Sequence, residues 1–92
     1  MTVVTLYGKP NCHLCEQALD VIRLVRARYP FELSLRNILE SLDDYERFKH
    51  DIPVIFFEGV EIARHKLTEK QLLDALAARR SVGYNDATGA QP

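Results

Sequence analysis

The chain lacks, or has few of, several residue types and segments that are typical of particular classes of protein. Its 92 residues include no tryptophan, one methionine and two cysteines. Twelve lysines and arginines stand against 13 acidic residues, so the formal net charge is −1, and no basic block is present. The positive charge expected of a nucleic-acid-binding domain is therefore missing, and we expect no nucleic-acid partner.

Long apolar runs are also missing, because the longest are far shorter than the ~20 residues that a membrane-spanning helix needs. The amino-terminal segment Met-Thr-Val-Val-Thr lacks the basic start and apolar core of a secretory signal. We therefore expect no membrane association and a cytoplasmic location. In that reducing compartment a cysteine pair is more often catalytic or metal-binding than structural.

The length and composition predict one globular domain with one modest core. A hydrophobic fraction of 47% and a charged fraction of 27% are ordinary for a soluble domain. We predict that residues 1–80 form this domain, as a monomer. From residue 81 onward small and polar residues leave little to bury, which predicts a flexible carboxyl-terminal tail over residues 81–92.

Apolar periodicity divides residues 1–80 into seven elements. We expect a strand over 3–7, a helix over 13–29, a strand over 31–36, a helix over 41–49, strands over 54–57 and 60–64 joined by a turn at 58–59, and a helix from residue 68. Pro30 ends the first helix, Ser41 caps the second, and Thr68 with Gln71 forms a capping box before the third.

The resulting order, β-α-β-α-β-β-α, predicts an α/β fold. The first β-α-β unit is long enough for a right-handed crossover between parallel strands, and the second half closes with an antiparallel hairpin. We therefore expect a four-stranded mixed sheet flanked by three helices.

The two cysteines, Cys12 and Cys15, lie three residues apart between a predicted strand and a predicted helix. The free N–H groups and positive dipole end of a helix stabilise a thiolate and lower its pKa. A second thiol one helical turn later can attack the mixed disulfide that the first one forms. This placement predicts thiol–disulfide exchange, with Cys12 the more exposed thiol and Cys15 the more buried one.

The charged residues near the pair allow two interpretations each. Lys9 either supports the Cys12 thiolate or is a solvated turn residue. His13 either favours the thiolate when its imidazole is protonated or is an exposed polar side chain. The segment 64–66, Arg-His-Lys, is either a rim for anionic substrates or a solvated charge cluster.

Over residues 1 to about 80 the chain resembles the glutaredoxin-like proteins of the thioredoxin fold. Residues 7–15, Tyr-Gly-Lys-Pro-Asn-Cys-His-Leu-Cys, have the tyrosine, lysine and cysteine spacing typical of glutaredoxins. Residues 51–54, Asp-Ile-Pro-Val, fall where that family has its cis-proline. The resemblance implies a thioredoxin-like fold, Cys12 as nucleophile, Cys15 as resolving thiol, and a cis Pro53 facing the sulfurs. It also implies that the backbone of Ile52 pairs with a bound peptide or glutathione.

Three segments depart from the glutaredoxin pattern. His-Leu at 13–14 replaces Pro-Tyr, Asp-Ile at 51–52 replaces Thr-Val, and Ala-Arg-His-Lys at 63–66 replaces Gly-Gly and a polar or acidic pair. In the family, the polar or acidic pair after Gly-Gly holds the glutamyl end of glutathione. Whether this chain uses glutathione therefore stays open, and we expect no bound cofactor. The chain also lacks the Trp-Cys-Gly-Pro-Cys of thioredoxins.

A metal-binding module is the main alternative from another class. The cysteine pair is half of a zinc site, which His50 and His65 could complete, although their spacing does not fit the usual closed pattern. An iron–sulfur cluster shared between two chains through Cys12, and a redox-inactive partner-binding domain, are further alternatives. We predict a dithiol–disulfide oxidoreductase without a metal. Its expected substrates are a disulfide-containing protein or a low-molecular-weight thiol, contacted by Lys9, His13, Ile52 and Pro53.

Overall fold

The computed structural model describes the backbone of residues 2–88 and the side chains of residues 2–79. Its elements are β1 (Val3–Gly8), α1 (His13–Arg26), β2 (Glu32–Asn37), the 3₁₀ helix η1 (Ile38–Glu40), α2 (Leu42–Phe48), β3 (Val54–Phe57), β4 (Val60–Arg64) and α3 (Glu69–Thr88). The predicted order β-α-β-α-β-β-α is confirmed. In the described part of the chain, no helix combines the length and the apolar character that crossing a membrane requires.

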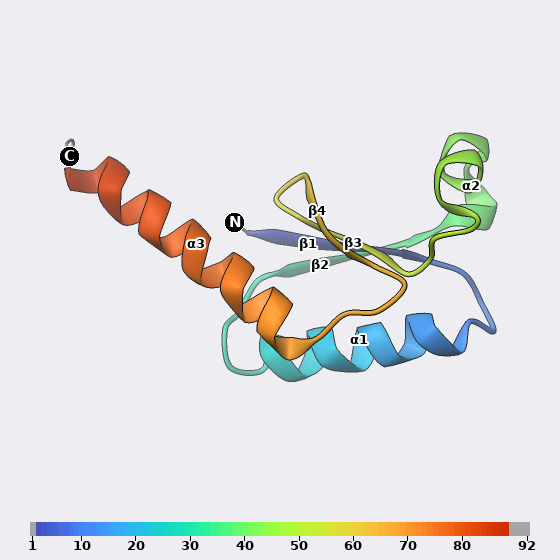
Figure 1. Cartoon of the computed structure of the whole chain (residues 1–92), viewed down its shortest axis with the longest axis horizontal. Helices are drawn as coiled ribbons and strands as arrows, with labels where there is room; N and C mark the ends of the chain where they lie inside the picture. Colours follow the sequence, from blue (N-terminus) through green and yellow to red (C-terminus); the bar gives the residue numbers. More distant parts are fainter. Residues whose placement is uncertain (1, 89–92) are drawn as a thin grey trace.

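The four strands form one mixed sheet in the order β2-β1-β3-β4. Strand β1 runs parallel to β2 and antiparallel to β3, and β3 and β4 form the predicted hairpin. Helices α1 and α3 cover one face of the sheet, and the short α2 lies on the other (Figure 1). This is the predicted thioredoxin-like arrangement.

Side chains alternate across β1, so that the sheet separates two apolar clusters. Val4 and Leu6 belong to the larger cluster, which α1 and α3 cover and which also contains Ile22, Ile55 and Leu72. On the opposite face, Tyr7 packs against a smaller cluster of Ile38, Phe48 and Val54. The ring centroids of Tyr7 and Phe48 are 4.7 Å apart. Tyr7 is thus a packing residue near the end of its strand.

The hairpin turn lies at the end of the sheet opposite to the cysteines. Glu58 and Gly59 both have positive φ angles, 51° and 82°, which suits the tight turn of a two-residue hairpin. The carboxylate of Glu58 accepts a hydrogen bond of 2.6 Å from the backbone N–H of Val3. It also pairs with Arg79 of α3 at 2.8 Å. One side chain therefore connects the hairpin, β1 and α3.

Helix α1 ends earlier than the sequence predicts. We expected the helix to run to Tyr29, whereas it ends at Arg26 and the N–H groups of both Arg28 and Tyr29 donate to the carbonyl oxygen of Val25. A proline disfavours helical geometry in the residue before it, so Pro30 acts on Tyr29 and shortens the helix.

Helix α3 ends later than predicted, because its backbone is helical to Thr88 where we expected a tail from residue 81. Residues 81–88 contain no proline, and their one glycine, Gly83, costs a helix only about 1 kcal/mol. The other residues of the predicted tail, 89–92, lie outside the described residues. The domain boundary at residue 80 stays a prediction.

Candidate active site

A tight turn after β1 places Cys12 at the amino-terminal end of α1. Asn11 adopts the left-handed conformation, with φ of 63°, which asparagine tolerates better than most residues. Cys12 is the N-cap of α1, and its Sγ accepts a hydrogen bond of 3.2 Å from the backbone N–H of Cys15. The first sulfur therefore receives an N–H group that the helix leaves unpaired, as an activated thiolate requires.

The two cysteines are joined in a disulfide, with their Cα atoms 5.2 Å apart. Cys12 is half-buried, whereas Cys15 is buried with only 6% of its surface exposed. This difference in exposure is the one we predicted for an attacking thiol and a resolving thiol. An incoming disulfide has access to Cys12 before it has access to Cys15.

Gly8, the last residue of β1, lies directly against Cys15. A β-carbon at position 8 would lie 3.0 Å from the Sγ of Cys15 and 3.2 Å from its Cβ, closer than side chains normally approach. The absence of a side chain therefore lets the buried sulfur pack onto the end of the strand. Gly8 was not among the predicted site residues, although its place between a strand and the cysteine turn was a usable signal.

The loop before β3 lies at the same end of the sheet as the cysteine turn, because Tyr7 of β1 pairs with Val54 of β3. The Ile52–Pro53 peptide bond is cis, as predicted. Pro53 is fully buried, and Ile52 is half-buried. The two stretches that carry the family resemblance thus meet at one end of the molecule.

The segment after β4 is tied to this proline loop. The N–H of His65 donates to the carbonyl oxygen of Pro53 at 2.7 Å, and its Nε2 lies 3.2 Å from a carboxylate oxygen of Asp51. Arg64 pairs with the same carboxylate at 3.0 Å and with Glu61 at 2.6 Å. The guanidinium of Arg64 holds the pKa of the Glu61 carboxyl below its usual value. The charge of Arg64 is therefore compensated internally, which favours the charge-cluster interpretation.

The residues of the zinc alternative are not assembled. The Nε2 atom of His65 lies 3.3 Å from the backbone carbonyl oxygen of His50, in addition to its contact with Asp51. Within the part of the chain that the structure describes, no three or more His, Cys, Asp or Glu side chains are grouped so that they could hold a metal ion.

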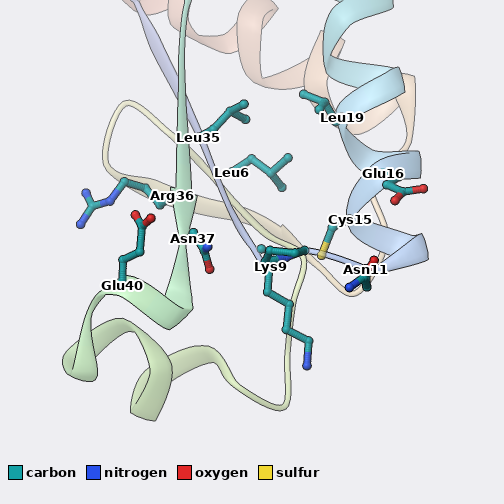
Figure 2. A pocket seen from close by; sticks show the side chains of 12 residues that line it. Leu6, Lys9, Asn11, Cys15, Glu16, Leu19, Leu35, Arg36, Asn37 and Glu40 are labelled. Atoms are coloured by element: carbon teal, nitrogen blue, oxygen red, sulfur yellow. The ribbon is translucent and has the colours of Figure 1, made fainter.

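Lys9 and His13 are two exposed residues near the cysteine pair. Lys9 is exposed, and Figure 2 shows its amine pointing away from the Cys15 sulfur. His13 is exposed on the first turn of α1, with its Nε2 3.1 Å from the side-chain nitrogen of Gln17. This geometry favours the solvated interpretation for Lys9.

A pocket of about 450 Å³ opens beside Cys15 (Figure 2). Residues of β1, the cysteine turn, α1, β2 and η1 line it: Leu6, Gly8, Lys9, Pro10, Asn11, Cys15, Glu16, Leu19, Leu35, Arg36, Asn37 and Glu40. This pocket was not predicted from the sequence. The alternation of Phe31, Leu33 and Leu35 with polar residues predicts a half-buried strand with these three side chains on its buried face, whereas 54% of Leu35 is exposed. The prediction was wrong because α1 leaves the end of β2 uncovered at this pocket.

Solved structures of other proteins share the fold of this chain. The solution structure of protein Ne2328 from Nitrosomonas europaea has a TM-score of 0.70 at 25% identity, over 79% of this chain and 88% of that one. The target protein XcR50 from X. campestris has a TM-score of 0.65 at 28% identity, over 82% and 96%. Thioredoxin 1 from Thermosipho africanus has a TM-score of 0.65 over 89% and 98%, and at 10% identity it shows the fold alone.

The family comparison covers most of the domain. The model of the glutaredoxin-like domain (DUF836) matches residues 3–77, which include both cysteines and the cis-proline. A glutaredoxin-like thioredoxin fold with a Cys-x-x-Cys pair supports a redox-type role. The chain belongs to the glutaredoxin-like domain family.

Proposed function

We propose that the protein is a dithiol–disulfide oxidoreductase with Cys12 as its nucleophile. One observation carries this proposal. The more exposed sulfur lies at the start of α1, where it accepts the N–H of Cys15, and its disulfide partner is the buried Cys15. A helix end stabilises a thiolate at this position, and burial withholds the second thiol from bulky substrates.

The proposed reaction has two exchange steps. The Cys12 thiolate attacks one sulfur of a substrate disulfide, which forms a mixed disulfide and releases the first substrate thiolate. The Cys15 thiolate then attacks the Sγ of Cys12, which forms the Cys12–Cys15 disulfide and releases the second substrate thiolate. The substrate disulfide gains two electrons and the protein dithiol loses two. One external dithiol, or two monothiols, returns the protein to its reduced form.

We propose a soluble thiol such as glutathione as the external reductant, without a dedicated binding site for it. In glutaredoxins the segment corresponding to residues 63–66 holds the glutamyl end of glutathione. Here Arg64 is paired with Asp51 and Glu61. Polar groups of a ligand that find no partner weaken its binding, so glutathione should bind this segment poorly. The cytoplasmic location and the monomeric state stay predictions.

Serine substitutions test the two thiol roles. We expect Cys12→Ser to reduce dithiol-dependent turnover at least about 1,000-fold, because a hydroxyl at this position is not ionised near pH 7. Cys15→Ser should instead accumulate a mixed disulfide on Cys12, which mass spectrometry of the intact protein detects. Turnover is measured with a protein disulfide and, on the same preparation, with a glutathione mixed disulfide.

The two substrates also distinguish the possible specificities. Activity with the glutathione mixed disulfide alone would contradict the absence of a dedicated glutathione site. Substantial turnover by Cys12→Ser would refute the proposed function. Ala78→Ser serves as the control, since it introduces a serine at an exposed position of α3 outside the candidate site and leaves both sulfurs in place.

A further inference from the structure

The pocket beside Cys15 has an apolar interior. Figure 2 shows Leu6, Leu19 and Leu35 pointing into it from β1, α1 and β2, with the Cys15 sulfur at one end. Leu6 and Leu35 are register partners on adjacent parallel strands, so their side chains lie on the same face of the sheet. More than half of Leu35 is in contact with solvent. A ligand that covers this leucine gains the free energy of burying apolar surface, about 25 cal/mol per Å².

This pocket is separate from the proline loop. Its lining comes from β1, the cysteine turn, α1, β2 and η1, and includes no residue of 51–53. A substrate segment in the pocket would therefore approach the cysteine pair from the β2 side of the sheet. The loop that carries Pro53 would remain available for the residues that flank the reacting cysteine.

The pocket adjoins a free strand edge. β2 is the outermost strand on its side of the sheet, and among the described residues it pairs only with β1. An extended peptide can add to such an edge through backbone hydrogen bonds, about 4.8 Å from the strand. Alternate side chains of the added strand would then face the same side as Leu35. The edge supplies an attachment for a polypeptide that a small molecule could not use.

Charges of both signs surround the opening. Lys9 and Arg36 are cationic, whereas Glu16 and Glu40 are acidic. Arg36 is further engaged by Asp44 at 3.2 Å. Since neither sign dominates, the opening does not select a charged ligand, and the leucine-lined interior suits an uncharged apolar group.

We propose that the pocket receives an apolar side chain of a protein substrate. An extended segment of that substrate pairs with the free edge of β2 and places a large aliphatic or aromatic side chain between Leu19 and Leu35. The pocket reaches Cys15, which is the disulfide partner of the nucleophile Cys12. The anchoring side chain therefore lies within a few residues of the substrate cysteine. This proposal rests on the proposed oxidoreductase function and specifies its substrate class.

The test uses disulfide-linked peptides of polar sequence in which one leucine is moved along the positions near the cysteine. We expect kcat/KM to rise about tenfold for one position over the all-polar peptide, from partial burial of one leucine side chain. Leu35→Gln should abolish this preference. The disulfide of 2-mercaptoethanol, which has no side chain to anchor, should be reduced equally by the wild-type protein and by Leu35→Gln.

Leu24→Gln is the matched control. Leu24 lies on α1, is 55% exposed against 54% for Leu35, and is not part of the pocket lining. It should keep the leucine preference. No preference in the wild-type protein, its retention in Leu35→Gln, or its equal loss in both variants would each overturn the pocket proposal. Failure to reduce even the small disulfide would instead overturn the proposed function.

A binding measurement decides the pocket's role even if the chemistry fails. The leucine peptide without its disulfide is titrated into the oxidised protein, and amide chemical shifts are followed. We expect shifts at Leu19 and Leu35 and their loss in Leu35→Gln. Shifts confined to residues 51–53, or no shifts, would contradict the proposal. Self-association that Leu35→Gln abolishes would assign the pocket to a second copy of the chain and likewise overturn it.

Discussion

At Gly8 the backbone of β1 passes so close to Cys15 that the strand has no space for a side chain. Gly8→Ala would bring a β-carbon to 3.0 Å from the Cys15 sulfur, so that the buried thiol must move by a few tenths of an ångström. We expect the reduction potential of the pair to change by about 30 mV, which corresponds to ~1.4 kcal/mol. Equilibration with a thiol–disulfide buffer of known potential measures the change.

Gly59 provides the control for that substitution. It lies in the β3–β4 turn with φ of 82°, and a β-carbon there meets no atom within 4 Å. Gly59→Ala should therefore lower the free energy of unfolding by about 1 kcal/mol through backbone strain alone. Its reduction potential should equal that of the wild-type protein. If both alanine variants shift the potential equally, close packing on Cys15 is not the cause.

At the scale of elements, two segments meet around the cis-proline. Asp51 pairs with Arg64 at the end of β4 and with His65 directly after it, and His65 donates its backbone N–H to Pro53. These contacts hold the loop before β3 against the end of β4. Asp51, the acidic residue of these ion pairs, belongs to the loop that we expect to contact substrate. We therefore infer that the ion pairs hold this loop in position.

Asp51→Asn tests that positioning role. The amide is uncharged and nearly isosteric, so the fold should persist with a loss of about 1 kcal/mol or less, as is usual for partly exposed ion pairs. We expect kcat/KM for a peptide disulfide to fall several-fold, because the loop before Pro53 is held less firmly. Reduction of 2-mercaptoethanol disulfide, which does not depend on peptide pairing, should change little. Lys70→Gln, which breaks the exposed pair with Asp74 on α3, is the control.

Local signals in the sequence predicted most elements correctly. Ser41 accepts the N–H of Asp44 at the start of α2, and Thr68 and Gln71 exchange the hydrogen bonds of a capping box at α3. The 3₁₀ helix η1 was missed. Its cap, the side chain of Asn37 on the N–H of Leu39, spans only two residues and resembles an ordinary turn in sequence.

The candidate site likewise contains residues that the sequence predicted and contacts that it did not predict. Cys12 and Cys15 were recognisable from their spacing along the chain, and Pro53 from the resemblance to glutaredoxins. The contact of Gly8 with Cys15 and the pairing of Asp51 with Arg64 depend on how strands and loops pack. The exposure of Leu35 depends on how far α1 extends across the sheet. Periodicity within one strand contains no information about that coverage.

For the whole molecule, the candidate active site lies at one end of the sheet, and the contacts that join the hairpin to β1 and α3 lie at the other. The cysteine turn and the proline loop share the end where Tyr7 pairs with Val54. At the other end, Glu58 joins the hairpin to β1 and to α3 through Val3 and Arg79. The long α3 extends away from the sheet beyond this junction (Figure 1).

A chain that ends after residue 80 tests the predicted domain boundary. Leu72 is fully buried, Leu73 and Leu76 pack against the core, and Arg79 pairs with Glu58, so each of these contacts of α3 remains. We expect Tm to stay within ~4 °C of the full chain, because a loss of 1 kcal/mol lowers Tm by about 4–8 °C in a domain of this size. Differential scanning calorimetry measures it.

A chain that ends after residue 74 is the control, because it removes Leu76 and Arg79 and should lose several kcal/mol. A leucine that packs against a core contributes about 2–5 kcal/mol when truncated, which is a large part of the stability of so small a domain. If ending at residue 80 lowers Tm as much as ending at residue 74, the part of α3 from 81 to 88 belongs to the folded domain. The boundary then lies beyond residue 80, and the polar composition of residues 81–88 is not the mark of a tail.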